Sequence, residues 1–226
     1  MSTRSFTLTG KESILSHRYF PPIELNENRN YSIGLTHFVV YNSVPNIEER
    51  NNLFHFGEET IVIPTGSYEI EDIENYLKQK LRNEISLKAN HNTLRCEIQG
   101  SKEIDFTKPG SIGRLLGFGH EKLAANILHS STQPVDIVKL NVIIIDCNIV
   151  SGAYINERES HAIYQFAPVT SPGFKIIEIP HNILYLPVKR KQIDNISLSI
   201  TDQDGRLLNF RGETITVGLH LKEDGI

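Results

Sequence analysis

Residues 135–150 read VDIVKLNVIIIDCNIV, the strongest strand signal in the chain. Apolar side chains fall on both faces of the expected strand. One face carries Val138, Leu140, Val142 and Ile144, and the other carries Ile137, Ile143 and Ile145. A strand that is apolar on both faces has to be covered on both sides, by a facing sheet and by a helix or another subunit. We therefore expect the face with Val138, Leu140, Val142 and Ile144 to lie at the centre of a sandwich of two sheets.

Shorter strand patterns recur on both sides of this stretch. They are expected at residues 32–41, 60–63, 162–166, 174–179, 183–186, 196–200, 208–210 and 215–221. Proline, glycine, asparagine and aspartate separate them, as at turns. Short strands at this spacing favour an all-β fold, a β-sandwich of two four-stranded sheets, and about eight principal strands favour a jelly roll.

One segment has the period of a helix instead of a strand. Its apolar residues are Ile70, Ile73, Leu77 and Leu81, spaced by three and four, which predicts a helix over about 70–81 that begins near Ser67 or Glu69. A hairpin is expected next, over Ile85–Ile98, with its turn at residues 90–92. Residues 1–226 are thus expected to form a single jelly-roll domain with a helix-hairpin insertion at about residues 66–118.

The composition is that of an ordinary globular chain, with 226 residues, 39% apolar and 22% charged. The 23 basic and 27 acidic residues give a net charge of −4, so direct contact with nucleic acid is not expected. Cys96 and Cys147 lie far apart and no secretory signal precedes them, which favours an intracellular origin with free thiols. No apolar run approaches the ~18 residues of a membrane span.

Two groups of residues could suggest a metal site, and for each of them a structural role is the favoured interpretation. Nine histidines are scattered without the close spacing of a metal site. They are His17, His37, His55, His91, His120, His129, His161, His181 and His220. Asp202, Asp204 and Glu213 resemble part of a calcium loop, but Gly205 and Arg206 stand where such a loop needs other residues, which favours a hairpin turn.

Two further segments are interpreted in the same way. The three glycines between Ser111 and Gly119 lack the strand and helix that a phosphate-binding loop requires. The basic cluster Lys189-Arg190-Lys191 could contact an acidic tail or a genome, and a solvated loop is the favoured alternative. The sequence predicts no catalytic, cofactor-binding or metal-binding residue, and we do not expect an enzyme.

Three segments together resemble a known family. They are Ile63-Pro64-Thr65-Gly66-Ser67-Tyr68-Glu69-Ile70-Glu71-Asp72-Ile73-Glu74, then Ser111-Ile112-Gly113-Arg114-Leu115-Leu116-Gly117-Phe118, and the closing run from Leu198 to Glu213. In order and spacing the chain, from about Ser5 to Lys222, resembles the penton, or minor capsid, protein of Polinton/Maverick elements and adintoviruses.

The resemblance implies a single jelly roll that assembles as a homopentamer at the fivefold vertices of an icosahedral capsid. It implies a double-jelly-roll major capsid protein as the partner that forms the faces of the shell. The protein would then be made inside the host cell and reside in the virion. The alternative is a non-catalytic β-sandwich binding module, for example one that binds carbohydrate, although Trp is absent and the eight Tyr are dispersed.

Overall fold

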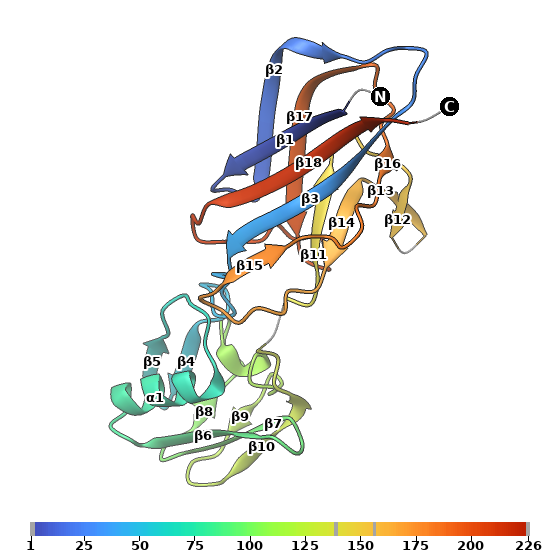
Figure 1. Ribbon diagram of the computed structural model, residues 1–226. Helices are drawn as coiled ribbons and strands as arrows, with labels where there is room; N and C mark the ends of the chain where they lie inside the picture. Colours follow the sequence, from blue (N-terminus) through green and yellow to red (C-terminus); the bar gives the residue numbers. More distant parts are fainter. Residues whose placement is uncertain (1–2, 138–139, 156, 225–226) are drawn as a thin grey trace. The chain divides into compact units, whose positions relative to one another are not determined.

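The computed structural model describes residues 3–137, 140–155 and 157–224 (Figure 1). The chain forms two compact units. The first combines Met1–Val44 with Leu140–Ile226, and we call it the sandwich unit. The second is the stretch between them, Pro45–Lys139, and we call it the inserted unit. Each unit has its own cluster of buried apolar side chains.

One sheet of the sandwich unit, sheet A, has the strand order β1-β18-β3-β15, with β16 also paired to β3. Its strands are β1 (Thr3–Gly10), β18 (Ile215–Glu223), β3 (Tyr31–Tyr41), β15 (Lys175–Glu178) and β16 (Leu186–Pro187). The two short strands share one edge of β3, because β15 pairs with residues 38–41 and β16 with residues 32–33. The expected strand at 183–186 is therefore reduced to its last residue and the proline that follows.

The facing sheet, sheet B, has the strand order β14-β11-β17-β2. Its strands are β14 (Ala162–Phe166), β11 (Ile143–Cys147), β17 (Gln192–Thr201) and β2 (Ile14–Glu24). Going along the chain, the principal strands alternate between the sheets except at β11 and β14, which are neighbours in sheet B. A small hairpin, β12 (Ala153–Ile155) and β13 (Arg158–Ser160), separates these two. This connectivity is that of an eight-stranded jelly roll and confirms the predicted fold class.

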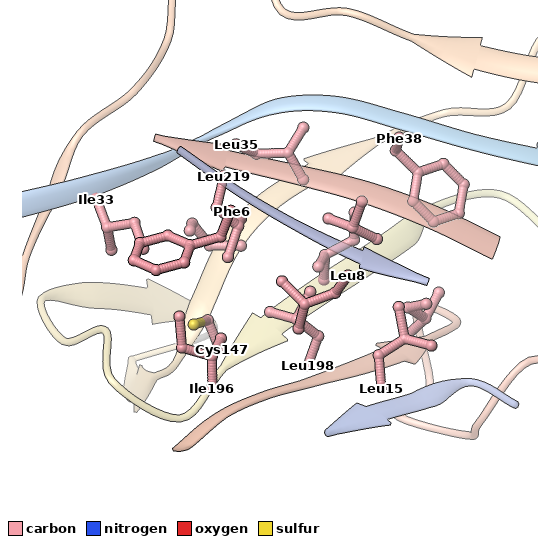
Figure 2. Packing of buried hydrophobic residues seen from close by; sticks show 14 of the residues in the cluster. Phe6, Leu8, Leu15, Ile33, Leu35, Phe38, Cys147, Ile196, Leu198 and Leu219 are labelled. Atoms are coloured by element: carbon pink, nitrogen blue, oxygen red, sulfur yellow. The ribbon is translucent and has the colours of Figure 1, made fainter. Parts of the chain in front are cut away.

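The core of the sandwich unit is formed by alternate residues of both sheets. Figure 2 shows labelled side chains of sheet A, among them Leu8, Leu35 and Leu219, packed toward Leu15 and Leu198 of sheet B. All five are at most 2% exposed. Full burial of one such side chain stabilises a fold by about 1.5–3 kcal/mol, so this layer supplies most of the driving force for pairing the sheets.

The prediction for residues 135–150 was wrong in both length and face. The strand there is β11, only Ile143–Cys147, and Ile143 and Ile145 point into the core with 0% exposure. Ile144 pairs with Thr201 and Gln165 and is buried, at 9% exposure, on the other face, outside the core cluster against which Leu140 packs. Leu140 and Val142 are half-buried before the strand begins, and Val138 lies outside the described residues.

Asp146 provides the physical reason for this register. Side chains alternate across a strand, so Ile144 and Asp146 share a face while Ile143, Ile145 and Cys147 share the other. The predicted register would have placed the Asp146 carboxylate in the apolar core, at a cost of several kcal/mol. On the outer face that carboxylate instead accepts a hydrogen bond from the Ser160 side chain and lies near His161. Burial still raises the pKa of Asp146, and these two neighbours oppose the rise.

A β-bulge in β3 changes which residues of that strand point inward. Gly218 pairs with His37 and Leu219 with Leu35, so Thr36 is the extra residue. Leu35 and Phe38 are consequently both buried, and His37 lies half-exposed on the outer face. A Cβ atom on Gly218 would lie 2.2 Å from Cε1 of His37, so a side chain there would force the imidazole to move.

The inserted unit contains two small sheets, a helix and a 3-10 turn. The sheets have the orders β5-β4-β8-β9 and β10-β7-β6. Their strands are β4 (Leu53–Phe56), β5 (Glu59–Val62), β6 (Ile85–Asn90), β7 (Arg95–Gly100), β8 (Ile104–Asp105), β9 (Lys122–Leu123) and β10 (His129–Pro134). The helix is α1 (Ile70–Lys80), and η1 (Ile112–Arg114) is the 3-10 turn.

The predicted helix and hairpin are both confirmed. Helix α1 buries Ile70, Ile73 and Leu77, as its spacing indicated, and contacts β6 of the hairpin. Its start is set by Glu69, whose backbone N–H donates to the Asp72 carboxylate at 3.0 Å. Lys78 and Lys80 in the last turn are favourable at the negative end of the helix dipole.

The unit that holds these elements is longer than the segment expected at about residues 66–118. It begins at Pro45, before β4, and extends past β10. The reason is that β4 and β10 pair only with strands of this unit, and that Phe54 and Phe56 of β4 belong to its core. In the jelly roll the insertion stands between β3 and β11.

Gly117 is the position in the inserted unit that tolerates a side chain least. Its φ is +82°, and a Cβ atom would lie 2.2 Å from the backbone oxygen of Gln133. We expect Gly117→Ala to lower the free energy of unfolding by about 2–3 kcal/mol, since both the left-handed backbone and the backbone contact oppose it. Chemical denaturation monitored by circular dichroism measures this loss.

Gly205→Ala is the matched control for that variant. Gly205 also has a positive φ, +75°, but nothing lies within 4 Å of a Cβ atom placed there. Its substitution should cost only the strain of the left-handed backbone, about 1 kcal/mol. Equal losses for the two variants would contradict the close packing of Gly117 against residue 133.

Candidate assembly surface

The structure brings no metal-binding constellation together in residues 3–137, 140–155 and 157–224. No group of three or more His, Cys, Asp and Glu side chains in these ranges could hold a metal ion. The turn at Asp202 uses its carboxylate for the backbone, since Oδ1 accepts from the N–H groups of Asp204 and Arg206. That arrangement is the hairpin turn that the sequence favoured.

The basic side chains of Lys189, Arg190 and Lys191 all contact residues of the sandwich unit itself. Lys189 pairs with Glu159 at 3.6 Å, and Arg190 pairs with Asp194 at 3.6 Å. The Lys191 ammonium donates to the Glu27 carbonyl at 2.6 Å. The two cysteines are equally enclosed, and burial raises the pKa of Cys96 to about 12 and that of Cys147 to about 11. Such thiols stay protonated and unreactive at neutral pH.

His55 is a buried histidine in the inserted unit. It is 5% exposed, its Nδ1 lies 3.0 Å from Oγ1 of Thr60, and its Nε2 has no hydrogen-bond partner. Burial lowers its pKa, the Lys108 cation lowers it further, and Asp105 partly opposes both. The folded unit therefore holds this imidazole in its neutral form more strongly than the unfolded chain does.

We expect this histidine to make the inserted unit less stable in mild acid. Because the folded pKa lies below the unfolded value of about 6.5, the unfolded state binds more protons as the pH falls below that value. Stability is therefore full above about pH 6.5 and declines below it. Asp105 does not interfere, since its hydrogen bonds with Thr107 hold its pKa at about 2. The measurement is the melting temperature at pH 7.5 and 5.5 for the wild type and for His55→Gln, and the wild type should lose more.

Tyr185 fastens the segment between β15 and β16 to the outer face of sheet A. Its hydroxyl lies 2.7 Å from Nδ1 of His220, and the Lys222 ammonium lies 3.9 Å from its ring centroid. A Cβ atom on Gly34 would lie 2.6 Å from the Leu184 carbonyl oxygen, so the segment crosses close above β3. His220, which the sequence placed inside a strand, thus has a structural role on the surface.

The outer faces of both sheets are otherwise mainly polar. On sheet B they present serine and asparagine side chains along β2 and β17. These are Ser16, Asn195, Ser197 and Ser199. On sheet A, Ser5, Thr7 and Thr9 of β1 lie opposite alternate residues of β18. Near the β15 edge of sheet A, Tyr41 and Ile177 also lie on the outer face, since they alternate with the buried Val40 and Ile176.

Exposed apolar side chains of the sandwich unit include a group around the edge strand β15 and two residues of the edge strand β2. We call the first group the β15 patch. It consists of Tyr41, Val169, Phe174, Ile177 and Ile179, which are 44%, 96%, 67%, 59% and 64% exposed. In β2, Ile14 and Phe20 are 53% and 98% exposed and stand six residues apart along the strand.

The β15 patch is held in place by the end of β3. The Asn42 side chain donates to the Thr170 carbonyl at 2.6 Å, and the Asn42 N–H donates to the Phe174 carbonyl at 2.8 Å. The Lys175 ammonium lies 5.1 Å from the Tyr41 ring centroid. Behind the patch, the Tyr164 hydroxyl of β14 donates to the Glu178 carboxylate at 2.8 Å and joins the two edge strands. Burial and this carboxylate raise the pKa of Tyr164.

Phe20 projects from an irregular stretch of β2. Arg18 pairs with Asn195 and Ile23 with Ile193, so residues 19–22 form a bulge opposite one residue of β17. Pro21 and Pro22 carry no N–H donor, which prevents another strand from pairing along this part of the edge. The exposed Phe20 side chain therefore lies on an edge that cannot pair with another strand.

The whole chain has the fold of a solved protein. It matches the crystal structure of the selenomethionine-labelled mavirus penton protein with a TM-score of 0.53, over 99% of this chain and 100% of that one. The chain therefore shares its fold with that protein. The sequence identity is 10%, so the likeness lies in the arrangement of strands rather than in shared residues. No family model matches the chain, and no curated protein matches it in sequence.

The three segments that carried the sequence resemblance lie in both units of the chain. Ile63–Glu74 leads into helix α1, and Ser111–Phe118 contains η1, both in the inserted unit. The closing run covers the end of β17 and the turn toward β18. Among the described residues no helix has the length and apolar character of a membrane span.

The sequence did not indicate that the β15 patch and Phe20 would be exposed. Two features of the sequence could have been used. Phe20 stands in a Phe-Pro-Pro run, and residues 174–179 have apolar side chains on both faces of the expected strand. Ile176 is 3% exposed and Ile177 is 59% exposed, although the two side chains are alike. Only the position of β15 at the sheet edge, with one face against the core, separates them.

Proposed function

We propose that this protein is a penton, or minor capsid, subunit that forms a homopentamer at the vertices of an icosahedral capsid. The observation that carries the proposal is the likeness to the mavirus penton protein along the full length of both chains. An arrangement shared from end to end, including the inserted unit, is more specific than a jelly roll alone, which serves many functions. The protein would reside in the virion after synthesis in the host cell.

The distribution of surface residues supports a structural role. A ring subunit needs two different contact surfaces on the same chain, because each copy meets one neighbour on either side. The β15 patch is a candidate for one of them. A double-jelly-roll major capsid protein is the proposed partner around the ring.

Mass measurement over a concentration series tests this function. We expect native mass spectrometry and sedimentation velocity to detect monomer at low concentration and pentamer at high concentration, as the main species. A dominant dimer or trimer at every concentration would count against the penton. A monomer that binds immobilised glycans would favour the carbohydrate-binding module instead.

A further inference from the structure

We propose that the outer edge of strand β1 binds an extended segment of another protein, which adds to sheet A as an antiparallel strand. The site is the backbone of Thr3–Gly10, on the side of β1 that faces away from β18. The ligand is a peptide in which apolar and small polar side chains alternate. This inference goes beyond the penton role and does not rest on it, because it depends only on the sandwich unit.

The first argument is that β1 is a long and regular edge. β1 has eight residues, and all eight pair with β18 in one register without a shift (Figure 1). In the part of the chain that the structure describes, β1 pairs with no second strand. It contains no proline, so each of its residues keeps its N–H group. A row of unpaired N–H and C=O groups on such an edge is a template for another strand.

The three other edge strands of the sandwich lack this regularity. β15 and β14 are four and five residues long, and Pro180 and Pro168 follow them closely. In β2, two prolines lie in the bulge at residues 19–22. Short length, proline and bulges are the features by which natural sheets prevent pairing at their edges. Residues 3–10 have none of the three, which singles out β1 as the edge that is kept open for a partner.

The second argument identifies the backbone groups that face outward. In an antiparallel strand the N–H and C=O groups of one residue point to the same side, and that side alternates along the strand. The Thr9 carbonyl points away from β18, since its oxygen lies 3.3 Å from Nε2 of His17 in β2. Ser5 and Thr7 are two and four residues before Thr9, so their N–H and C=O groups also face outward. Both residues are exposed, so a partner can reach these groups.

The third argument gives the side-chain pattern of the ligand. Phe6 of β1 points into the core and contacts the half-buried Tyr19 of β2, with ring centroids 5.6 Å apart. Inward side chains of an added strand would extend this layer beside Tyr19, which favours apolar residues there. Its outward side chains would stand beside Ser5 and Thr7, where hydroxyl-bearing and β-branched residues pair well. The ligand is therefore apolar at every second residue.

Thr7→Pro tests the edge. The substitution removes an N–H group that faces away from β18, so it blocks the outer edge while the pairing with β18 is kept. The probe is a fluorescent synthetic peptide as long as β1, in which valine and threonine alternate between terminal lysines. In fluorescence anisotropy the wild type should bind this peptide, and Thr7→Pro should bind it at least ~10-fold more weakly.

Thr7→Val is the matched control, because it changes the side chain and keeps the N–H group. It should bind the peptide as the wild type does. Melting monitored by circular dichroism verifies that each variant is folded, and Ser5→Pro replaces Thr7→Pro if the latter is not. Equal weakening by Thr7→Pro and Thr7→Val would contradict binding through the backbone.

N-methylated peptides test the antiparallel mode of addition. In that mode the threonines of the probe lie opposite Ser5 and Thr7, and their N–H groups face β1, whereas the valine N–H groups face away. Methylation of one central threonine nitrogen should therefore weaken binding at least ~10-fold, and methylation of the neighbouring valine nitrogen should leave it unchanged. Equal binding of the two methylated peptides, or the opposite order, would overturn the antiparallel assignment.

Amide hydrogen exchange measured by nuclear magnetic resonance locates the contact. The N–H groups of Phe6 and Leu8 face β18 and should exchange slowly in the free protein. Those of Ser5 and Thr7 should become protected only when the probe is bound. Unchanged exchange at these two residues, or no binding of the probe by the wild type, would overturn the proposal.

The mass measurements on the protein without peptide separate the remaining outcomes. A dimer of the wild type that Thr7→Pro disrupts would mean that a second copy occupies the edge, and the proposal would be wrong. Pentamer formation is read in the same series and does not depend on the probe. The penton can therefore fail while the β1 site stands, and the β1 site can fail while the penton stands.

Discussion

Replacing Ile145 by aspartate is expected to lower the free energy of unfolding of the sandwich unit by about 3–5 kcal/mol. Ile145 is 0% exposed in β11, between β14 and β17, and belongs to the core of the jelly roll. A carboxylate at this position would be buried without a cationic partner. Equilibrium unfolding in urea, monitored by circular dichroism, measures the loss if the variant folds, and soluble yield reports it if the variant does not.

Ile14→Asp is the matched control for that substitution. Ile14 is also an isoleucine in a strand of sheet B, but it is 53% exposed at the edge. A carboxylate there keeps its water, so the expected change is within about 0.5 kcal/mol. If Ile145→Asp unfolded at the same urea concentration as Ile14→Asp, the inward register of β11 would be wrong.

Replacing Phe54 by alanine is expected to destabilise the inserted unit by about 3–5 kcal/mol. Phe54 is 0% exposed in β4, with its ring centroid 6.4 Å from that of Phe56 and 6.1 Å from that of Phe106. The cavity left by the ring removes contacts that belong only to the core of this unit. Hydrogen exchange measured by mass spectrometry should show lost protection in residues 45–139.

Phe38→Ala supplies the complementary measurement. Phe38 is 0% exposed in β3 and packs with Phe166 and Phe210 in the core of the sandwich unit. Its loss of protection should appear in residues 3–44 and 140–224. Because the two cores share no residue, the two variants should give different exchange patterns. The same pattern from both would show that the units unfold as one.

The sequence predicted elements best where a local pattern was strong and uninterrupted. The strand at 162–166 has the predicted bounds, and residues 215–221 fall within β18 with the predicted alternation. Helix α1 ends one residue before the predicted end. β1 and β2 gave no comparable signal, because β1 buries only Phe6 and Leu8, and most of β2 is exposed at a sheet edge. An edge strand has fewer core positions and therefore a weaker period.

Registers and surfaces required the tertiary structure. In β3 the inward residues alternate up to Leu35, and after the bulge at Thr36 they alternate again from Phe38. A regular alternation along the sequence does not reveal this change. In β11 the apolar residues fit either face, and the partners on the sheet together with Asp146 select one. The boundary of the inserted unit likewise depends on β4 and β10 finding their partners within it.

For this protein, the sequence by itself determined the fold class, the helix and hairpin of the insertion, and the lack of an obvious catalytic motif. These depend on periodicity and residue type, which are properties of short segments. Tertiary structure alone determined that Ile145 is buried while Ile177 is exposed, and that Phe20 projects from an edge. The physical reason is that burial depends on what packs against a side chain. For strands in a sandwich, that partner comes from a distant part of the chain.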